Sequence, residues 1–197
     1  MAKRLFDIIF SFLGLILVLP LLLLLAVLIK RESPGPVFYR GVRIGKGGRL
    51  FRIFKFRSMV ENAEELGGPS TAGGDSRLTK IGKFLKKYQL DELPQLINVL
   101  RGEMSLVGPR PEIKMYVEMM TNEERNVILS IKPGMTDLAS LWNFHESEVL
   151  KGSPDPEKTY QEKIRPQKIK LQLEYVKNRS FLLDLKIIIK TVLKIFQ

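Results

Sequence analysis

The residues best suited to chemistry lie in the stretch Tyr88-Gln89-Leu90-Asp91-Glu92-Leu93-Pro94-Gln95. Pro94 fits a helix only near its first turn, and the apolar run that follows ends at Gly102, so we expect a helix that begins near Asp91. Free backbone N–H groups and the helix dipole at such a start favour an ionised carboxylate and attract a phosphate. Asp91 therefore fits a nucleophile beside a phosphate or, as the more common alternative, an ordinary capping residue.

A second candidate is the triplet Pro109-Arg110-Pro111, which follows Gly108. Two prolines restrict the backbone on both sides of the arginine, and a guanidinium can bind two phosphate oxygens at once. A pre-oriented arginine loses little entropy when it binds a diphosphate. Taken alone, the triplet would equally describe a rigid surface turn with an incidental arginine.

These residues follow an N-terminal segment that belongs in lipid. No charged residue occurs between Ile8 and Ile29, and a helix of that length reaches roughly 30 Å, the thickness of a hydrocarbon core. The run is too long for a cleaved signal peptide, and residues 30–36 offer no cleavage site. Pro20 lacks an N–H and predicts a bend. Because basic residues flank both ends, the residues alone leave a spanning helix and a re-entrant hairpin open.

Composition limits the chemistry further. The chain of 197 residues has 32 Lys and Arg against 21 Asp and Glu, so its net charge of +11 favours an anionic partner. It has no cysteine and a single histidine, which excludes a disulfide framework, a thiol nucleophile and the usual zinc sites. A metal ion would have to be bound by carboxylates.

The remaining patterns predict an α+β fold. Val37–Tyr39 and Leu50–Phe56 are rich in aromatic and β-branched residues and are separated by glycines, a pattern typical of a small β-hairpin. The basic stretch from Lys30 to Arg57 borders the lipid segment, so we expect it to face anionic headgroups rather than nucleic acid. Ser180–Phe196 carries lysines at every fourth position among apolar residues, which predicts an amphipathic helix for the membrane interface or for the domain's own core.

Several ordered motifs extend over nearly the whole chain. An apolar segment with a central proline is followed by Lys55–Met59, Asp75–Thr79, Leu90–Leu96, Gly108–Pro111 and Lys132–Thr136. In this order the motifs resemble the bacterial sugar transferases, the small monotopic phosphoglycosyl transferases. The resemblance implies a re-entrant membrane helix over residues 1–35 on the cytoplasmic face of the bacterial inner membrane. Residues 36–197 would form a mostly helical catalytic domain with a small β-hairpin and amphipathic interfacial helices.

The resemblance also implies a reaction, in which a sugar 1-phosphate moves from a UDP-sugar to a polyprenol phosphate (undecaprenyl phosphate) and UMP is released. Asp91 would attack the phosphorus next to the sugar and form an aspartyl-phosphosugar intermediate, which the lipid phosphate then breaks. Glu92 would bind a metal or accept a proton, with Mg²⁺ held through Asp91 and Glu92. The substrate-binding candidates are Arg57, Arg77, Lys86, Pro109, Arg110 and Pro111.

Some residues depart from the family's pattern. Lys86 stands where many relatives have an arginine, and a lysine cannot reproduce a planar two-point contact with phosphate. After the last motif the chain has Asp137-Leu138-Ala139-Ser140 instead of Gly-Trp-Ala-Gln, and Trp142, His145 and Glu146 follow. We therefore expect a different sugar subclass. We interpret His145 as a surface or packing residue.

The partners expected on this interpretation are a UDP-sugar, a polyprenol phosphate, an anionic phospholipid surface and downstream glycosyltransferases, with no nucleic acid. The rival interpretation is a non-catalytic, membrane-anchored basic scaffold that binds anionic lipid or nucleic acid. A scaffold keeps its ligand when Asp91 and Arg110 are changed and loses it in salt. An enzyme loses UMP release when Asp91 is changed.

Overall fold

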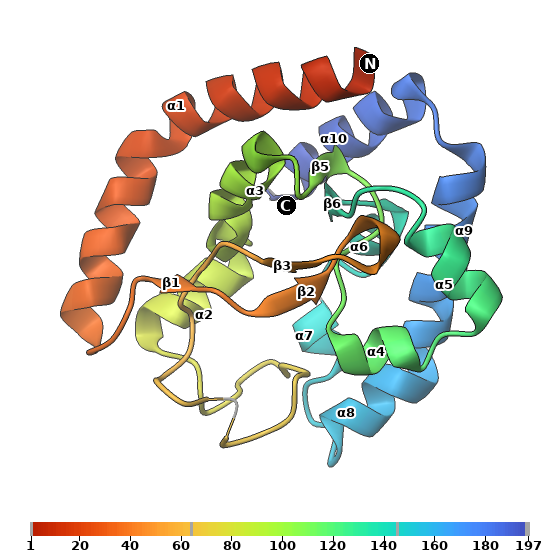
Figure 1. The fold of residues 1–197 in the computed structure, drawn as a ribbon. Coiled ribbons are helices and arrows are strands. Elements are labelled where there is room, and N and C mark those ends of the chain that lie inside the picture. Colours follow the sequence, from red (N-terminus) through yellow and green to blue (C-terminus); the bar gives the residue numbers. More distant parts are fainter. Residues whose placement is uncertain (1, 64, 145, 196–197) are drawn as a thin grey trace.

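A computed structural model of the protein defines residues 2–63, 65–144 and 146–195. Within these ranges the chain is mostly helical with a few short strands, which confirms the expected α+β fold (Figure 1). A long N-terminal helix, α1 (Ala2–Glu32), runs along one side of the molecule. The elements that follow are, in chain order, β1 (Phe38–Tyr39), β2 (Val42–Ile44), the 3₁₀ turn η1 (Lys46–Gly48), β3 (Leu50–Arg52), β4 (Lys55–Phe56), α2 (Lys80–Lys87), the 3₁₀ turn η2 (Leu90–Gln95), α3 (Leu96–Arg101), β5 (Ser105–Val107), α4 (Lys114–Glu118), α5 (Asn122–Ile128), β6 (Gly134–Thr136), α6 (Leu138–Trp142), α7 (Glu146–Val149), α8 (Pro156–Thr159), the π-helical turn η3 (Tyr160–Ile164), α9 (Arg165–Asn178) and α10 (Phe181–Ile195).

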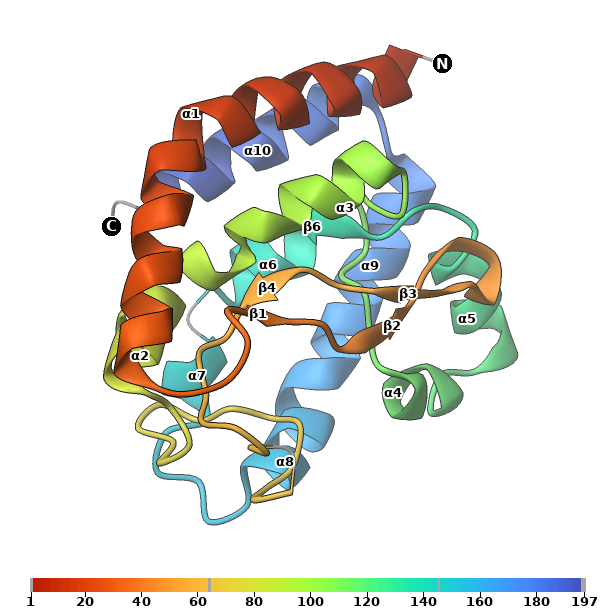
Figure 2. The ribbon, with the colours of Figure 1, turned by 60° about the vertical axis from the view of Figure 1, so that its left-hand side comes forward.

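Helix α1 is long and apolar enough to cross a membrane. In its most apolar window of 18 residues only 11% of the positions are buried, so most of its apolar side chains face away from the domain. The helix stays continuous but bends in its middle, which Figure 1 and Figure 2 show from two sides. Pro20 is the one proline inside it, and the bend agrees with the carbonyl that this residue leaves without a donor.

The first two turns of α1 are bound to the domain by charged side chains. Lys3 pairs with Asp184 of α10 at 2.5 Å. Arg4 donates to the carbonyl oxygens of residues 99 and 100, at the end of α3, at 2.6 and 3.0 Å. Asp7, which is 2% exposed, accepts hydrogen bonds from the Ser105 hydroxyl and the Leu106 N–H of β5.

The last turn of α1 is bound to the same domain on another side. The Glu32 carboxylate accepts the N–H groups of Lys80 and Ile81, the first residues of α2, at 2.7 and 3.0 Å. Arg57 donates to carbonyl oxygens of residues 29, 33 and 34, where α1 ends. The apolar residues of this half of α1 share a core with β4 and α2, formed by Leu22, Leu25, Ile29, Phe56 and Leu85. Both ends of the apolar helix therefore contact one domain.

The predicted hairpin is present as two successive antiparallel pairs, β1 with β4 and β2 with β3. Gly47 and Gly48 in the connecting turn have φ of 66° and 78°, a conformation that favours glycine. A parallel pair of β5 and β6 was not predicted, because each strand has only three residues. A Cβ on Gly134 would lie 2.1 Å from the Gly108 nitrogen, so this pair requires a glycine there.

The C-terminal helices α9 and α10 pack against the parallel pair of β5 and β6. Tyr175 of α9 is fully buried, and its hydroxyl donates to Asp184 at 2.6 Å and to the Val107 carbonyl at 3.2 Å. The expected C-terminal helix is confirmed as α10, which packs beside the first half of α1 through Phe181 and Phe6 (Figure 2). Its outer side exposes five apolar side chains, Phe181, Leu182, Ile189, Val192 and Leu193.

Candidate functional site

The two candidate carboxylates lie on η2, a 3₁₀ turn, and the α-helix that follows begins only at Leu96. We expected a helix that begins near Asp91: helical structure does begin at Leu90, but as a 3₁₀ turn whose N-cap is Gln89, with Asp91 inside the turn. In an α-helix Pro94 would clash with the carbonyl of Leu90, and the tighter turn avoids this clash. Asp91 is 2% exposed, and α3 ends at Gly102 as expected.

Three cations from three other segments surround these carboxylates. Lys86, near the end of α2, places Nζ 3.2 Å from Oδ2 of Asp91. Lys55 of β4 donates to Oε1 of Glu92 at 2.8 Å. Arg110 binds both oxygens of Glu92, and its Nη1–Oε2 distance is 2.9 Å. We call these five residues the Asp91 cluster. Its three positive and two negative groups give it a net charge of one positive unit.

The protonation states follow from this arrangement. Burial opposes ionisation of Glu92, but the charges and hydrogen bonds of Arg110 and Lys55 hold its pKa well below the usual range. The charge of Asp91 raises the pKa of Lys86. Burial, helped by the charges of Arg110 and Lys86 and opposed by that of Glu92, lowers the pKa of Lys55 to about 8. At neutral pH the Asp91 cluster therefore holds an ionised Glu92 and a charged Lys86.

The Pro-Arg-Pro triplet is part of this site and is not a surface turn. Pro109 and Pro111 are buried, while the Arg110 side chain is 28% exposed. The Pro109 carbonyl accepts the N–H of Gly134 at 2.9 Å, and the Arg110 N–H lies 3.3 Å from Oδ2 of Asp137. The backbone on both sides of the arginine is therefore fixed, and the guanidinium points at Glu92.

Two of the predicted substrate-binding residues have other partners. The Arg57 side chain is directed at the carbonyls where α1 ends. Arg77 pairs with Asp75 at 2.7 Å and donates to the carbonyl oxygens of residues 63, 68 and 70, which orders the glycine-rich segment 67–74. Both residues hold the chain in place, and among the described residues neither forms a hydrogen bond or ion pair with the Asp91 cluster.

The carboxylates of the Asp91 cluster are the candidate ligands for Mg²⁺, which binds oxygen donors. In the part of the chain that the structure describes, no three groups from Asp, Glu, His or Cys come together. Both Glu92 oxygens are engaged by cations, so Glu92 does not fit the ligand role expected for it. Asp91 fits as a single carboxylate, which is how Mg²⁺ is often held when substrate phosphates supply further oxygens.

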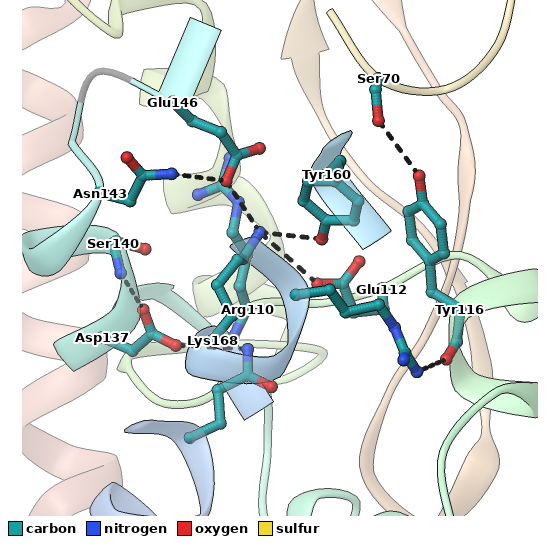
Figure 3. Close-up of polar contacts among 12 residues, drawn as sticks. Ser70, Arg110, Glu112, Tyr116, Asp137, Ser140, Asn143, Glu146, Tyr160 and Lys168 are labelled. Atoms are coloured by element: carbon teal, nitrogen blue, oxygen red, sulfur yellow. Dashed lines mark hydrogen bonds and ion pairs between the residues drawn. The ribbon is translucent and has the colours of Figure 1, made fainter. Parts of the chain in front are cut away.

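Sequence reasoning missed a second group of charges behind Arg110 (Figure 3). Lys168 of α9 has a side chain only 10% exposed and lies 3.2 Å from Glu146, 3.9 Å from Glu112 and 3.1 Å from the Tyr160 hydroxyl. Burial alone would lower the pKa of Lys168, but the charges of Glu112 and Glu146 raise it above its ordinary value. We call these four residues the Lys168 cluster. Sequence spacing did not predict it, because Glu112 and Glu146 come from two segments far from the continuous helix of η3 and α9 that carries Tyr160 and Lys168.

Comparison with known proteins decides the family. The family model described as "Bacterial sugar transferase" matches residues 1–197. The chain belongs to the bacterial sugar transferase family. This confirms the resemblance found from the motifs. The interpretation of His145 as a surface or packing residue concerns a position outside the described residues.

Curated relatives of this bacterial sugar transferase have related names. The chain is 40% identical over 195 residues to a UDP-N-acetylgalactosamine-undecaprenyl-phosphate N-acetylgalactosaminephosphotransferase of Aeromonas hydrophila, covering 96% of this chain and 42% of that protein. It is 42% identical over 199 residues to a UDP-glucose:undecaprenyl-phosphate glucose-1-phosphate transferase of Klebsiella pneumoniae, covering 98% and 40%. A protein of the same name from Caulobacter vibrioides is 38% identical over 96% of this chain and 68% of its own length. The chain thus spans about two fifths of the first two relatives.

Proposed function

We propose that this bacterial sugar transferase moves a sugar 1-phosphate from a UDP-sugar to a polyprenol phosphate and releases UMP. The observation that carries the proposal is the buried Asp91, held by Lys86 and flanked by the ion pairs of Glu92 with Lys55 and Arg110. The names of the relatives support undecaprenyl phosphate as the acceptor and a UDP-linked neutral sugar, N-acetylgalactosamine or glucose, as the donor group.

The reaction uses Asp91 as the nucleophile in two displacements. A carboxylate oxygen of Asp91 bonds to the phosphorus that carries the sugar, while the bond from that phosphorus to the bridging oxygen breaks and UMP leaves with the electron pair. An oxygen of the lipid phosphate then attacks the same phosphorus, and the Asp91 carboxylate is restored. No proton has to be removed from either attacking group, because both are anions.

In this mechanism Glu92 positions cations and does not accept a proton. Its low pKa makes it a weak base, and both of its oxygens already accept hydrogen bonds from Arg110 and Lys55. Arg110, Lys55 and Lys86 supply positive charge to a donor diphosphate that approaches Asp91. A fixed set of cations of this kind reduces the repulsion between two phosphorylated reactants.

Asp91 is also the residue that would hold Mg²⁺, together with oxygens of the donor. The ion, when bound, would neutralise charge on the diphosphate. Glu92 is not included as a ligand, because Arg110 and Lys55 engage it.

We infer that α1 enters the cytoplasmic face of the inner membrane and returns to the same face. The inference is supported by the contacts of both ends of the helix with one domain, through Lys3 and Asp7 at its start and Glu32 at its end. Most apolar side chains between these points are exposed. The exposed apolar residues of α10, beside the first half of α1, would lie at the membrane surface.

The test is a trapping experiment with the full chain in detergent or vesicles. The enzyme is mixed with a UDP-sugar and no lipid acceptor, and the peptide containing Asp91 is examined by mass spectrometry. We expect an added mass equal to one sugar phosphate, and one UMP released per adduct. Asp91→Asn should lose both, whereas the matched variant Asp155→Asn, an exposed residue at the start of α8, should keep both.

The same experiment separates the enzyme from a basic scaffold. A scaffold forms no adduct and releases no UMP, and its lipid binding survives Asp91→Asn. Steady UMP release by Asp91→Asn at the rate of the unmodified protein would eliminate Asp91 as the nucleophile.

A further inference from the structure

Phe144, which closely follows α6, lies beside the Asp91 turn. Gln89, two residues before Asp91, has a φ of 53° and its side-chain amide donates to the Phe144 carbonyl at 3.0 Å. The departure from the family's pattern at residues 137–140 lies just before Phe144 in the chain, so the altered stretch leads into the residue that contacts the turn with the proposed nucleophile.

Glu146, the first residue of α7, extends toward Arg110 (Figure 3). Its side chain is 35% exposed, whereas that of Lys168 beneath it is 10% exposed. One Glu146 oxygen, Oε2, accepts hydrogen bonds from Lys168 at 3.2 Å and from Asn143 at 3.5 Å. The carboxylate is thus fixed from behind through one atom and still reaches solvent.

The sign of the charge changes from one cluster to the next. The Asp91 cluster has one more cation than carboxylate. In the Lys168 cluster a single lysine faces two carboxylates, Glu112 and Glu146, which leaves one negative charge. Arg110 lies between the two clusters, bound to Glu92 on one side and facing Glu146 on the other.

We propose that Glu146 accepts a hydrogen bond from an uncharged hydroxyl or amide N–H of the donor sugar and thereby selects neutral sugars over uronic acids. The proposal rests on the proposed function, in which Arg110 binds the donor diphosphate. The sugar is bonded to that diphosphate, so it must lie next to Arg110. A carboxylate there repels a second carboxylate, whereas hydroxyl and amide groups satisfy its free lone pairs.

The experiment measures binding of three ligands to the full chain by calorimetry without lipid acceptor. The ligands are UDP-glucose and UDP-glucuronic acid, which differ only at C6 of the sugar, and UDP, which lacks the sugar and has a free terminal phosphate. Three proteins are compared, and each carries Asp91→Asn so that no donor is consumed. The first has no other change, the second also carries Glu146→Gln, and the third also carries Glu148→Gln. Glu148 lies on the same short helix, is 61% exposed and pairs only with Lys151 among the described residues, so it is a matched control for loss of charge.

We expect Glu146→Gln to tighten binding of UDP-glucuronic acid by about tenfold, since a like charge has been removed. Binding of UDP should not change, and binding of UDP-glucose should weaken or stay the same. Glu148→Gln should leave all three dissociation constants as they were.

Three results would overturn the proposal. An unchanged ratio of the UDP-glucuronic acid and UDP-glucose constants would mean that Glu146 does not face the sugar. Equal tightening of UDP would place Glu146 beside the phosphates. Loss of all three ligands together with a lower melting temperature would assign Glu146 a structural role. Failure of the proposed function looks different, because then no UDP ligand binds to any of the proteins.

Discussion

Arg110 and Glu92 form a two-point ion pair, in which Nη1 of Arg110 lies 2.9 Å from Oε2 of Glu92 and Nη2 binds Oε1. The pair joins the loop after β5 to the turn that carries Asp91. Lys55 binds the same carboxylate from β4, so a single glutamate orients two cations that come from distant segments. The role that the sequence left open for Glu92 is therefore best explained as positioning.

Glu92→Gln should lower kcat for UMP release by on the order of a hundredfold, because Arg110 and Lys55 lose the charge that orients them. The pKa of Glu92 is far below neutrality, so the variant should keep the shape of the pH profile between about pH 5 and pH 7. Glu118→Gln, at an exposed i,i+4 pair with Lys114, serves as the control and should retain full activity. Disappearance of an acid limb in Glu92→Gln alone would instead identify Glu92 as a titrating base.

Lys55 should give the reaction an alkaline limit. Its pKa of about 8 means that the ammonium is present below that pH and is lost as the pH rises through it. Because the charged form is the one that attracts the diphosphate, kcat/KM should fall above about pH 8. Lys55→Arg should move the fall to higher pH, since arginine stays charged.

A matched control for that profile is Lys83→Arg, at an exposed position on α2. It should leave the pH dependence of kcat/KM unchanged. An alkaline limb that persists at the same pH in Lys55→Arg would assign the limit to another group.

Arg57 should affect stability and not donor binding. Arg57→Ala removes hydrogen bonds from a buried side chain to partly buried carbonyls where α1 ends, so it should lower the free energy of unfolding by about 1–3 kcal/mol. Melting in detergent would measure the loss, and the KM for the UDP-sugar should stay the same. A raised KM with an unchanged melting temperature would restore the substrate-binding role predicted from the sequence.

The membrane topology can be read with single cysteines, because the chain has none of its own. Ala2→Cys and Arg31→Cys occupy exposed positions near the two ends of α1, and Leu17→Cys occupies a side chain that is 81% exposed in its apolar middle. A re-entrant helix predicts that both end positions react with a water-soluble maleimide only from the cytoplasmic side, and that position 17 is shielded by lipid. Labelling of position 2 from the periplasm would mean that α1 spans the membrane.

Local sequence was sufficient for the elements whose signals are short in range. The apolar run and Pro20 predicted a long bent helix, the glycines between aromatic segments predicted the hairpin, and the lysine spacing predicted α10. The ordered motifs also predicted the family, and through it Asp91 and Arg110 as neighbours in one site. These patterns succeed because backbone preferences and amphipathic periods act over a few residues.

Side-chain partners were decided by the tertiary structure alone. Arg57, Arg77 and Arg110 were all predicted to bind substrate, yet of the three only Arg110 binds a residue of the Asp91 cluster. The other two bind carbonyl groups of chain segments that the fold brings beside them. Lys168 and Glu146 lie 22 residues apart, and no sequence pattern predicted their ion pair, which forms where the fold brings α9 close to α7. Charge type is written in the sequence, but a charge acts through distance and burial, and both are set only when separate segments pack together.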